Sequence, residues 1–170
     1  LLIKKKRSKK NPFFSVITVV KNDEKNIEKT IKSVAKQSFK NFEYLIIDGK
    51  SSDNTIKKIK KYKKKIDFFT SEKDKGIYFA MNKGIKFSKG KVIIFINSGD
   101  TFTKEALKII YNVFKKNKKI DFVFGTVLRK YTKSKILKYS YNVNKLFYNF
   151  DFATSHSTGF FLKRKIYNQI

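Results

Sequence analysis

The residues best suited to chemistry stand directly after one apolar stretch. Residues 92–96 are five apolar residues in a row, four of them β-branched, which predicts a strand covered on both faces. The chain then turns polar at Asn97, Gly99 and Asp100. A carboxylate on a tight turn, in a chain without cysteine, suits a hard cation such as Mg²⁺ or Mn²⁺ with a phosphate behind it. The alternative is an ordinary turn, because Asn, Gly and Asp are common turn residues.

Two earlier predicted strands also end in polar residues. Residues 13–20 run into Lys-Asn-Asp-Glu, and residues 42–48 end at Asp48. Ligands of open α/β sheets bind outside the carboxyl ends of the strands. We therefore expect one site formed by three strand ends, at residues 18–23, 48–53 and 97–100, with further polar groups from residues 74–76 and Asn82. The alternative for Asn82 is a buried, hydrogen-bonded amide on a helix face.

Strands and helices alternate along the chain. We expect strands at 13–20, 42–48, 66–70, 92–96, 121–127 and 158–162, with weaker strand character at 134–141. Helical periodicity places apolar faces at 27–35, 56–59, 77–87 and 107–114. The expected helix caps are Asn22 or Asp23, Asp53 and Thr103, and Gly90 is the expected stop after the third helix. This order predicts the α/β class, with a mostly parallel sheet and helices on both faces.

The composition fits one folded domain. Hydrophobic residues make up 41% of the 170 residues and aromatic residues 16%, which favours a packed core over disorder. The absence of cysteine excludes disulfides and thiolate metal sites, and the single histidine excludes a multi-histidine zinc site. No apolar run approaches the ~20 residues of a membrane span, and we recognise no signal peptide.

The first residues of the sequence are strongly basic, and its last residues resemble the start of a helix. Residues 1–12 are expected to form a basic tail, and residues 13–170 one domain. The sequence stops at residues 168–170 in what looks like the start of a helix, so we expect a domain that is truncated at its C-terminus.

A formal net charge of +28 needs its own explanation. Such a charge would favour nucleic acid, anionic lipid or phosphorylated ligands. Only Arg7, Arg129 and Arg164 are arginines, whereas proteins that read nucleic acid rely on arginine for bidentate contacts. Lysine is spread over every polar segment, which indicates a solvated surface. A basic nucleic-acid-binding domain is the alternative hypothesis, favoured if the lysines form one contiguous face, and a modest attraction to anionic membrane is also expected.

Several common nucleotide and hydrolase motifs are missing. The sequence has no Gly-x-Gly-x-x-Gly after the first strand, no Gly-x-x-x-x-Gly-Lys-Ser/Thr and no Gly-x-Ser-x-Gly. These absences disfavour a dinucleotide-binding domain, a P-loop enzyme and an α/β-hydrolase.

Five blocks of the sequence, in order and at familiar spacing, resemble the family 2 glycosyltransferases. The blocks are residues 14–23, 30–39, 42–55, 71–85 and 90–100, so the stretch from the first to the last spans more than half of the chain. The resemblance implies a GT-A fold, with a Rossmann-like sheet whose residues 13–103 bind a nucleotide-diphosphate sugar and whose residues 104–170 begin the acceptor half. It also implies a likeness to enzymes of bacterial surface-polysaccharide synthesis.

The resemblance assigns roles to individual residues. Thr18 and Asn22 would line the nucleotide pocket, and Asp48 would accept a hydrogen bond from the base, which in uracil is the imide N–H. Asp74 and Lys75 would lie near the diphosphate and the sugar. Lys75 could instead be one more solvated lysine.

Asp100 would be the metal-binding carboxylate of a DXD-type motif, holding Mg²⁺ or Mn²⁺ against the diphosphate. Asn97 stands where the family usually has a first acid, and it would supply a neutral oxygen. Lys50 stands where the family more often has glycine or a small residue. Both departures leave the strength of metal and nucleotide binding open.

Direct displacement with inversion needs a general base that deprotonates the acceptor hydroxyl. The resemblance places this acid beyond Ile170, after a segment similar to residues 156–164, so the catalytic base stays unknown. His156 would lie on the acceptor side or near the diphosphate, and its alternative is a structural histidine.

The expected function is transfer of a sugar, with inversion, from a nucleotide-diphosphate sugar to a glycan or lipid-linked acceptor in cell-surface polysaccharide synthesis. UDP is the expected nucleotide, and the expected location is the cytoplasm, at the inner face of the plasma membrane. Apart from nucleic-acid binding, the remaining alternative is a transferase fragment that binds nucleotide without turnover.

Overall fold

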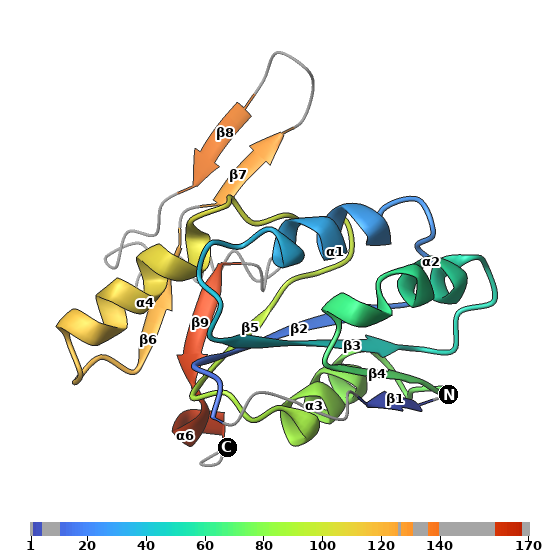
Figure 1. The fold of residues 1–170 in the computed structure, drawn as a ribbon, viewed down its shortest axis with the longest axis horizontal. Coiled ribbons are helices and arrows are strands. Elements are labelled where there is room, and N and C mark those ends of the chain that lie inside the picture. The colour runs from blue at the N-terminus through green and yellow to red at the C-terminus, as the bar shows by residue number, and fades with distance from the viewer. Residues whose placement is uncertain (1, 5–10, 126, 131–135, 140–158, 168–170) are drawn as a thin grey trace.

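A computed structural model describes residues 2–4, 11–125, 127–130, 136–139 and 159–167. The strands are β1 (Leu2–Lys4), β2 (Phe14–Val20), β3 (Phe42–Asp48), β4 (Phe68–Ser71), β5 (Val92–Phe95), β6 (Phe122–Phe124), β7 (Val127–Lys130), β8 (Ile136–Tyr139) and β9 (Phe160–Lys163). The helices are α1 (Ile27–Ala35), α2 (Thr55–Lys61), the 3₁₀ helix η1 (Lys63–Lys65), α3 (Ile77–Phe87), α4 (Ala106–Lys116) and α6 (Arg164–Tyr167). Figure 1 shows their arrangement.

The main sheet has the strand order β1-β4-β3-β2-β5-β9-β6. Its four central strands, β4, β3, β2 and β5, are parallel, and the outer strands β1, β9 and β6 each pair antiparallel with their neighbours. Strands β7 and β8 pair with each other as a separate two-stranded sheet. The predicted α/β class is therefore confirmed, and the antiparallel strands lie at the two edges.

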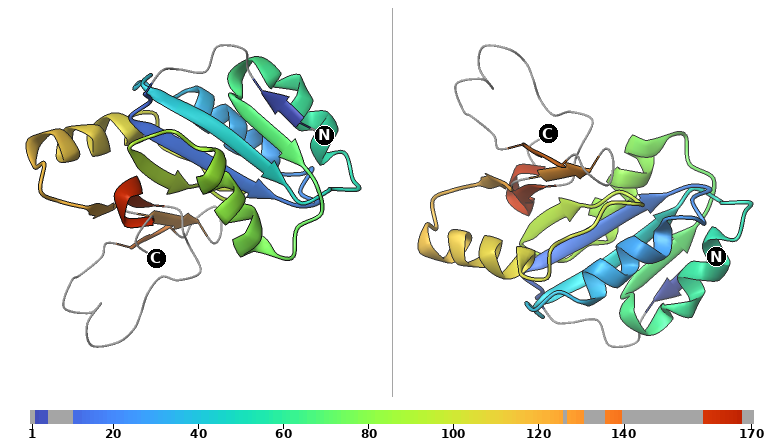
Figure 2. Two further views of the ribbon diagram at one scale, coloured as in Figure 1. Left: turned by 90° about the horizontal axis from the view of Figure 1, so that it is seen from below. Right: turned by 90° about the horizontal axis from the view of Figure 1, so that it is seen from above.

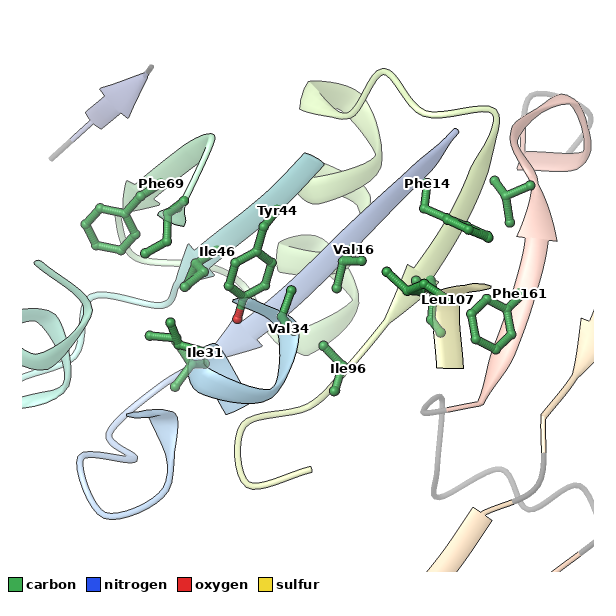
Figure 3. Close-up of a cluster of buried hydrophobic side chains, with 14 of the residues drawn as sticks. Phe14, Val16, Ile31, Val34, Tyr44, Ile46, Phe69, Ile96, Leu107 and Phe161 are labelled. Atoms are coloured by element: carbon green, nitrogen blue, oxygen red, sulfur yellow. The ribbon is translucent and has the colours of Figure 1, made fainter. Parts of the chain in front are cut away.

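The central strands are apolar on both faces because helices cover both faces. Along β2, residues 14, 16 and 20 belong to one buried cluster and residues 17 and 19 to a second. Helices α1, α2 and α4 cover the first cluster, whereas α3 covers the second, and these helices lie on opposite sides of the sheet (Figures 1 and 2). Figure 3 shows the first cluster, where Ile31 and Val34 of α1 point toward Tyr44 and Ile46 of β3.

Strand β1 was not expected from the sequence. Residues 1–12 read as a basic tail, yet Leu2–Lys4 pair with β4 in the register Leu2↔Thr70 and Lys4↔Phe68. These three residues extend the sheet, and without them the outer edge of β4 would be unpaired.

Three helix starts differ from the sequence expectation. Neither Asn22 nor Asp23 caps α1 through its side chain, because the helix begins later, at Ile27. Likewise α4 begins at Ala106, and Thr103 contributes a carbonyl to the preceding turn. Asp53 stands one residue before the N-cap position of α2, and its side chain accepts a hydrogen bond from the Thr55 N–H at 2.9 Å. The polar residues before these helices therefore form turns instead of caps.

Gly90 does not end α3, whose C-cap residue is Ser88, and it has a packing role instead. A Cβ atom at Gly90 would lie 2.5 Å from the backbone nitrogen of Ser15. Its N–H donates to the Ser15 hydroxyl, which in turn donates to the buried Glu43 carboxylate at 2.6 Å. This polar cluster closes the amino end of β2, opposite to the strand ends expected to carry chemistry.

None of the helices in the described part of the chain has the length and apolar character that crossing a membrane requires.

Gly84 sets how closely α3 approaches the sheet, and this gives a prediction. A Cβ atom at Gly84 would lie 2.6 Å from Cγ2 of Ile17, which is fully buried. Gly84→Ala adds about 1 kcal/mol of helix propensity. We expect the clash to outweigh it, with a net loss of about 1–3 kcal/mol in the free energy of unfolding.

Urea denaturation of Gly84→Ala measures this effect. Lys86→Ala is the control, because Lys86 is exposed on the same helix and its change should stay within about 0.5 kcal/mol. An increase in stability for Gly84→Ala would contradict the tight packing of α3.

Candidate functional site

The register of the sheet brings the predicted polar strand ends together. Asp48, the last residue of β3, pairs with Val20 at the end of β2 and with Ser71 at the end of β4. On the other side of β2, the Ile96 N–H donates to the Ile17 carbonyl at 2.9 Å, so β5 ends beside β2. The expectation that residues 18–23, 48–53 and 97–100 share one edge of the sheet is therefore confirmed.

The loops that follow β2 and β3 are bonded to each other. Asn22 has a φ angle of +52°, its N–H donates to the Ser51 hydroxyl at 2.8 Å, and its side-chain oxygen accepts from the Ser52 N–H at 2.8 Å. The Asp23 N–H donates to the Thr55 hydroxyl, and the Glu24 N–H donates to the Asp53 carboxylate. Asn22 is exposed, so it stands at the surface of this double loop.

Asp48 lies beneath the double loop. Its carboxylate accepts hydrogen bonds from the Ser51 N–H at 2.9 Å, the Ser51 hydroxyl at 2.5 Å and the Ser71 hydroxyl at 2.6 Å. The residue is fully buried. Three donors hold the carboxylate in one orientation, and a ligand donor could reach it only if a serine side chain turned away.

Lys50, which departs from the usual family pattern, occupies a strained position. Its φ angle is +60°, in the left-handed region that glycine adopts at little cost. Glycine would adopt this conformation at little cost, so this chain accepts a conformational cost by placing lysine there.

Thr18 does not reach the surface of the site. It is fully buried within β2, and its hydroxyl lies 3.0 Å from the hydroxyl of Tyr44 on β3. The expectation that Thr18 lines a nucleotide pocket is corrected, because alternation along the strand turns this side chain toward the core beneath α1. Burial raises the pKa of the Tyr44 hydroxyl, so the pair stays neutral.

Thr30 holds the turn that carries Asp100. Its hydroxyl accepts a hydrogen bond from the Gly99 N–H at 2.9 Å and donates to the Asp100 carbonyl at 2.8 Å. Thr30 is fully buried on α1, and Gly99 has a φ angle of +94°. The sequence reading assigned no role to Thr30. The signal that the sequence offered was a threonine among the apolar positions of the helix.

Further polar residues of α1 and its C-terminal end hold the segment that follows the turn. The Phe102 N–H donates to the Ser33 hydroxyl at 3.3 Å, and the Gln37 side chain donates to the Thr103 carbonyl at 2.7 Å. Gln37 also accepts from the Leu107 N–H at 3.1 Å, near the start of α4. We call Thr30, Ser33 and Gln37 the α1 polar row.

The loop before α3 carries a second pair of predicted site residues. Asp74 is nearly buried, with 8% of its side chain exposed, and Lys83 of α3 contacts it at 2.5 Å. The other oxygen of Asp74, Oδ2, is buried without a hydrogen-bond partner. Lys75 and Asn82 are exposed, so Asn82 is not a buried amide.

Lys83 is a residue that the sequence reading missed. Its ammonium group bridges Asp74 and Glu72, which it contacts at 2.7 Å. Burial alone would lower the pKa of Lys83, but the two carboxylates outweigh it and raise the pKa. The hydrogen bond from Lys83 also lowers the pKa of Glu72. One ammonium therefore links α3 to both ends of the loop segment 72–74.

The turn at 97–100 offers oxygen donors for a hard cation. Asp100 supplies a carboxylate, Asn97 an amide oxygen, and the buried hydroxyl of Ser98 has no hydrogen-bond partner. Within the described residues, no three His, Asp or Glu side chains cluster as a metal site. The donor set fits Mg²⁺ or Mn²⁺ of the kind held by one or two carboxylates together with substrate phosphates. His156 lies outside the described residues.

Thr30 gives a testable prediction about this turn. Thr30→Val keeps the shape of the side chain but leaves the Gly99 N–H without its acceptor, so we expect a loss of about 1–3 kcal/mol in the free energy of unfolding. Hydrogen exchange at the Gly99 amide should accelerate more than exchange in β2. Thr103→Val, in an exposed threonine of the same segment, is the control. Equal effects of the two substitutions would contradict the role of Thr30.

Comparison with curated proteins finds transferases. The chain is 35% identical over 112 residues to the UDP-Glc:α-D-GlcNAc-diphosphoundecaprenol β-1,3-glucosyltransferase WfgD of Escherichia coli, covering 65% of this chain and 44% of WfgD. It is 36% identical over 116 residues to the poly(ribitol-phosphate) β-N-acetylglucosaminyltransferase TarP of Staphylococcus aureus, covering 65% of this chain and 35% of TarP. The matched region therefore spans less than half of each relative.

Solved structures give the same fold. The structure of S. aureus TarS residues 1–349 with UDP aligns with a TM-score of 0.72 at 22% identity, over 92% of this chain and 48% of that one. The same protein with UDP-GlcNAc aligns with a TM-score of 0.63 at 27% identity, over 72% of this chain and 36% of that one. A mannosyltransferase from Pyrobaculum calidifontis with GDP-Man and Mn²⁺ aligns with a TM-score of 0.69 at 13% identity, over 94% of this chain and 47% of that one.

The sequence profile described as glycosyl transferase family 2 matches residues 15–170, which is most of the chain. It includes the three polar strand ends, the α1 polar row and the Asp74 loop. The chain therefore belongs to glycosyl transferase family 2.

Proposed function

We propose that this protein transfers a sugar, with inversion, from a UDP-sugar to a phosphate-bearing glycan or lipid-linked acceptor of the bacterial cell surface. The observation that carries the proposal is the meeting of three polar strand ends at one sheet edge, within a family 2 transferase chain. The names of the relatives support the substrate class, since WfgD uses UDP-glucose and TarP acts on poly(ribitol-phosphate). The cytoplasmic face of the membrane is the proposed location.

The double loop after β2 and β3 is the proposed nucleoside site. Asn22 stands at its surface, and Asp48 lies beneath it as an acceptor held by Ser51 and Ser71. A carboxylate held in this way suits the imide N–H of uracil, provided that Ser51 or Ser71 turns aside on binding. We therefore propose that Asp48 recognises the base and that Asn22 orders the loop against it.

The sugar and diphosphate would lie between the turn at 97–100 and the Asp74 loop. Asp74 Oδ2 is a buried acceptor without a partner, and a sugar hydroxyl would supply the missing donor. Lys75, which is exposed on the same loop, would approach a phosphate oxygen. Lys83 would hold Asp74 in place by its ion pair.

Asp100, with Asn97 and Ser98, would hold the divalent cation. When bound, this cation would offset the charge that develops on the departing nucleotide diphosphate. The α1 polar row would keep the turn in position while the ligands change, because it bonds to the backbone of the turn. Among the described residues we assign no general base.

A transfer assay tests the proposed function. The protein is incubated with UDP-glucose or UDP-GlcNAc, each with Mn²⁺, and with either a poly(ribitol phosphate) oligomer or a soluble GlcNAc-diphosphate acceptor, and release of UDP is measured. Acceptor-dependent UDP release is the expected result, and GDP-mannose should give none. If the protein binds UDP but forms no UDP from either UDP-sugar under any of these conditions, it is a nucleotide-binding fragment without turnover, and the proposed function is wrong.

Lys83 gives a separate prediction. Lys83→Met keeps the length of the side chain and removes the charge that holds Asp74 and Glu72. We expect the Kd for the UDP-sugar to rise about tenfold, which corresponds to about 1.4 kcal/mol. The Kd for UDP alone should change much less, because the effect lies at the sugar.

Calorimetric titration with both ligands measures these changes. Lys83→Arg should recover most of the affinity, since it keeps the ion pairs, whereas Lys86→Met changes an exposed lysine on the same helix and should have no effect. Equal weakening of UDP and UDP-sugar binding by Lys83→Met would contradict a role in positioning Asp74.

A further inference from the structure

A second surface feature lies beside the turn at 97–100, on the outer side of α1. A groove of about 790 Å³ runs between α1 and the segment that leads from β5 to α4. Figure 1 shows that segment passing next to α1. Besides Glu28 and Ser33, the groove is lined by Lys25, Lys29, Lys32, Lys36, Lys104 and Phe102. We call it the lysine groove.

The lysines form a line because of helix geometry. Lys29, Lys32 and Lys36 are spaced by three and four residues, so they share one face of α1, opposite to buried Ile27 and Ile31. Seven residues of helix separate the first from the last, which places their Cα atoms about 10 Å apart along the axis. A row of about 10 Å fits about two successive phosphate groups of an extended polymer.

The charge of the groove is not balanced by carboxylates. Five of its residues are lysines, and its one acid, Glu28, accepts a hydrogen bond from the Tyr62 hydroxyl at 3.1 Å. Within the part of the chain that the structure describes, no ion pair joins a groove lysine to an Asp or Glu side chain. Neighbouring like charges on a helix repel one another, and a polyanion in the groove would relieve that repulsion.

The groove adjoins the segment that carries the Asp100 turn. Ser33, on its wall, accepts a hydrogen bond from the N–H of Phe102, which follows Asp100 by two residues. Thr30, one turn before Ser33, holds the Asp100 turn itself. A chain that occupied the groove would therefore lie beside the segment that carries Asp100.

We propose that the lysine groove binds successive phosphate groups of an extended, phosphodiester-linked acceptor polymer. This inference rests on the proposed function, because it assigns the acceptor class and a path for it. The half-buried ring of Phe102 gives the groove one apolar wall, against which the carbon backbone of such a polymer packs.

The competing explanation is that the whole molecule, with its net charge of +28, attracts any anion. Helix α2 offers a matched control. Lys57, Lys60 and Lys61 are also exposed helix residues, and none of the three lines the lysine groove. Changing three lysines to glutamine lowers the net charge equally on either helix, so only the location differs.

The test compares three proteins: the wild type, Lys29→Gln/Lys32→Gln/Lys36→Gln, and Lys57→Gln/Lys60→Gln/Lys61→Gln. The Kd for a fluorescent poly(ribitol phosphate) oligomer is measured by anisotropy at 0.15 M salt. We expect the α1 variant to bind about tenfold more weakly and the α2 variant less than threefold more weakly. UDP binding should be equal in all three proteins.

Three outcomes would overturn the inference. Equal weakening by the two variants would show a general electrostatic attraction. A soluble GlcNAc-diphosphate that binds the groove as tightly as the polymer would show that no extended chain is recognised. A single-stranded oligonucleotide of equal charge that binds more tightly than the polymer would point to nucleic acid. Absence of UDP binding in the wild type would refute the proposed function instead. The comparison of polymer binding by the α1 and α2 variants would still test the groove.

Discussion

The hydroxyl group of Thr30 is the contact on which the candidate site depends most. It accepts a hydrogen bond from one backbone group of the Asp100 turn and donates to another, and it does so from within the core, where water does not compete. Ser33 and Gln37 continue the same helix face along the segment that follows. Helix α1 therefore covers the sheet with its apolar residues and orders the metal-suited turn with its polar row. A loop placed in this way by a rigid helix keeps its backbone geometry when a ligand binds.

The site also contains polar groups whose burial is costly. Asp74 Oδ2 and the Ser98 hydroxyl are buried without partners, and such groups cost about 1–3 kcal/mol each when unsatisfied. Lys50 holds a left-handed backbone conformation in the loop above Asp48. Unpaired buried oxygens and backbone strain are expected where a ligand completes the structure. A sugar hydroxyl or a cation would pair with the unpaired oxygen atoms. Their position at one sheet edge, and not in the core, is the reason we connect them with donor binding.

The sequence predicted the helices and strands better than it predicted where their side chains lie and what they contact. Alternating apolar strands and amphipathic helices were sufficient for the α/β class and for the shared edge of β2, β3 and β5. The strand β1 was missed because three residues beside a basic run carry no periodic signal. Thr18 was misplaced because the strand is apolar on both faces, so alternation could not show which face it occupies. Thr30 acts through Asp100, 70 residues away, and that pairing becomes visible only when the sheet register is known. Lys83 lies nine residues after Asp74, but the loop between β4 and α3 has no periodic pattern from which their contact could be predicted.

Thermal unfolding with UDP, with and without Mn²⁺, tests the central claim most directly, in the wild type and in Asp100→Ala. Ligand at 100 times its dissociation constant should stabilise the wild type by about 2.7 kcal/mol. This corresponds to a rise in Tm of roughly 5–10 °C for a chain of this size. We predict that most of the rise requires Mn²⁺ and is lost in Asp100→Ala, while the Tm without ligand changes little. A metal-dependent rise that persists in Asp100→Ala, or no rise with UDP in the wild type, would contradict the assignment of this sheet edge as the nucleotide-sugar site.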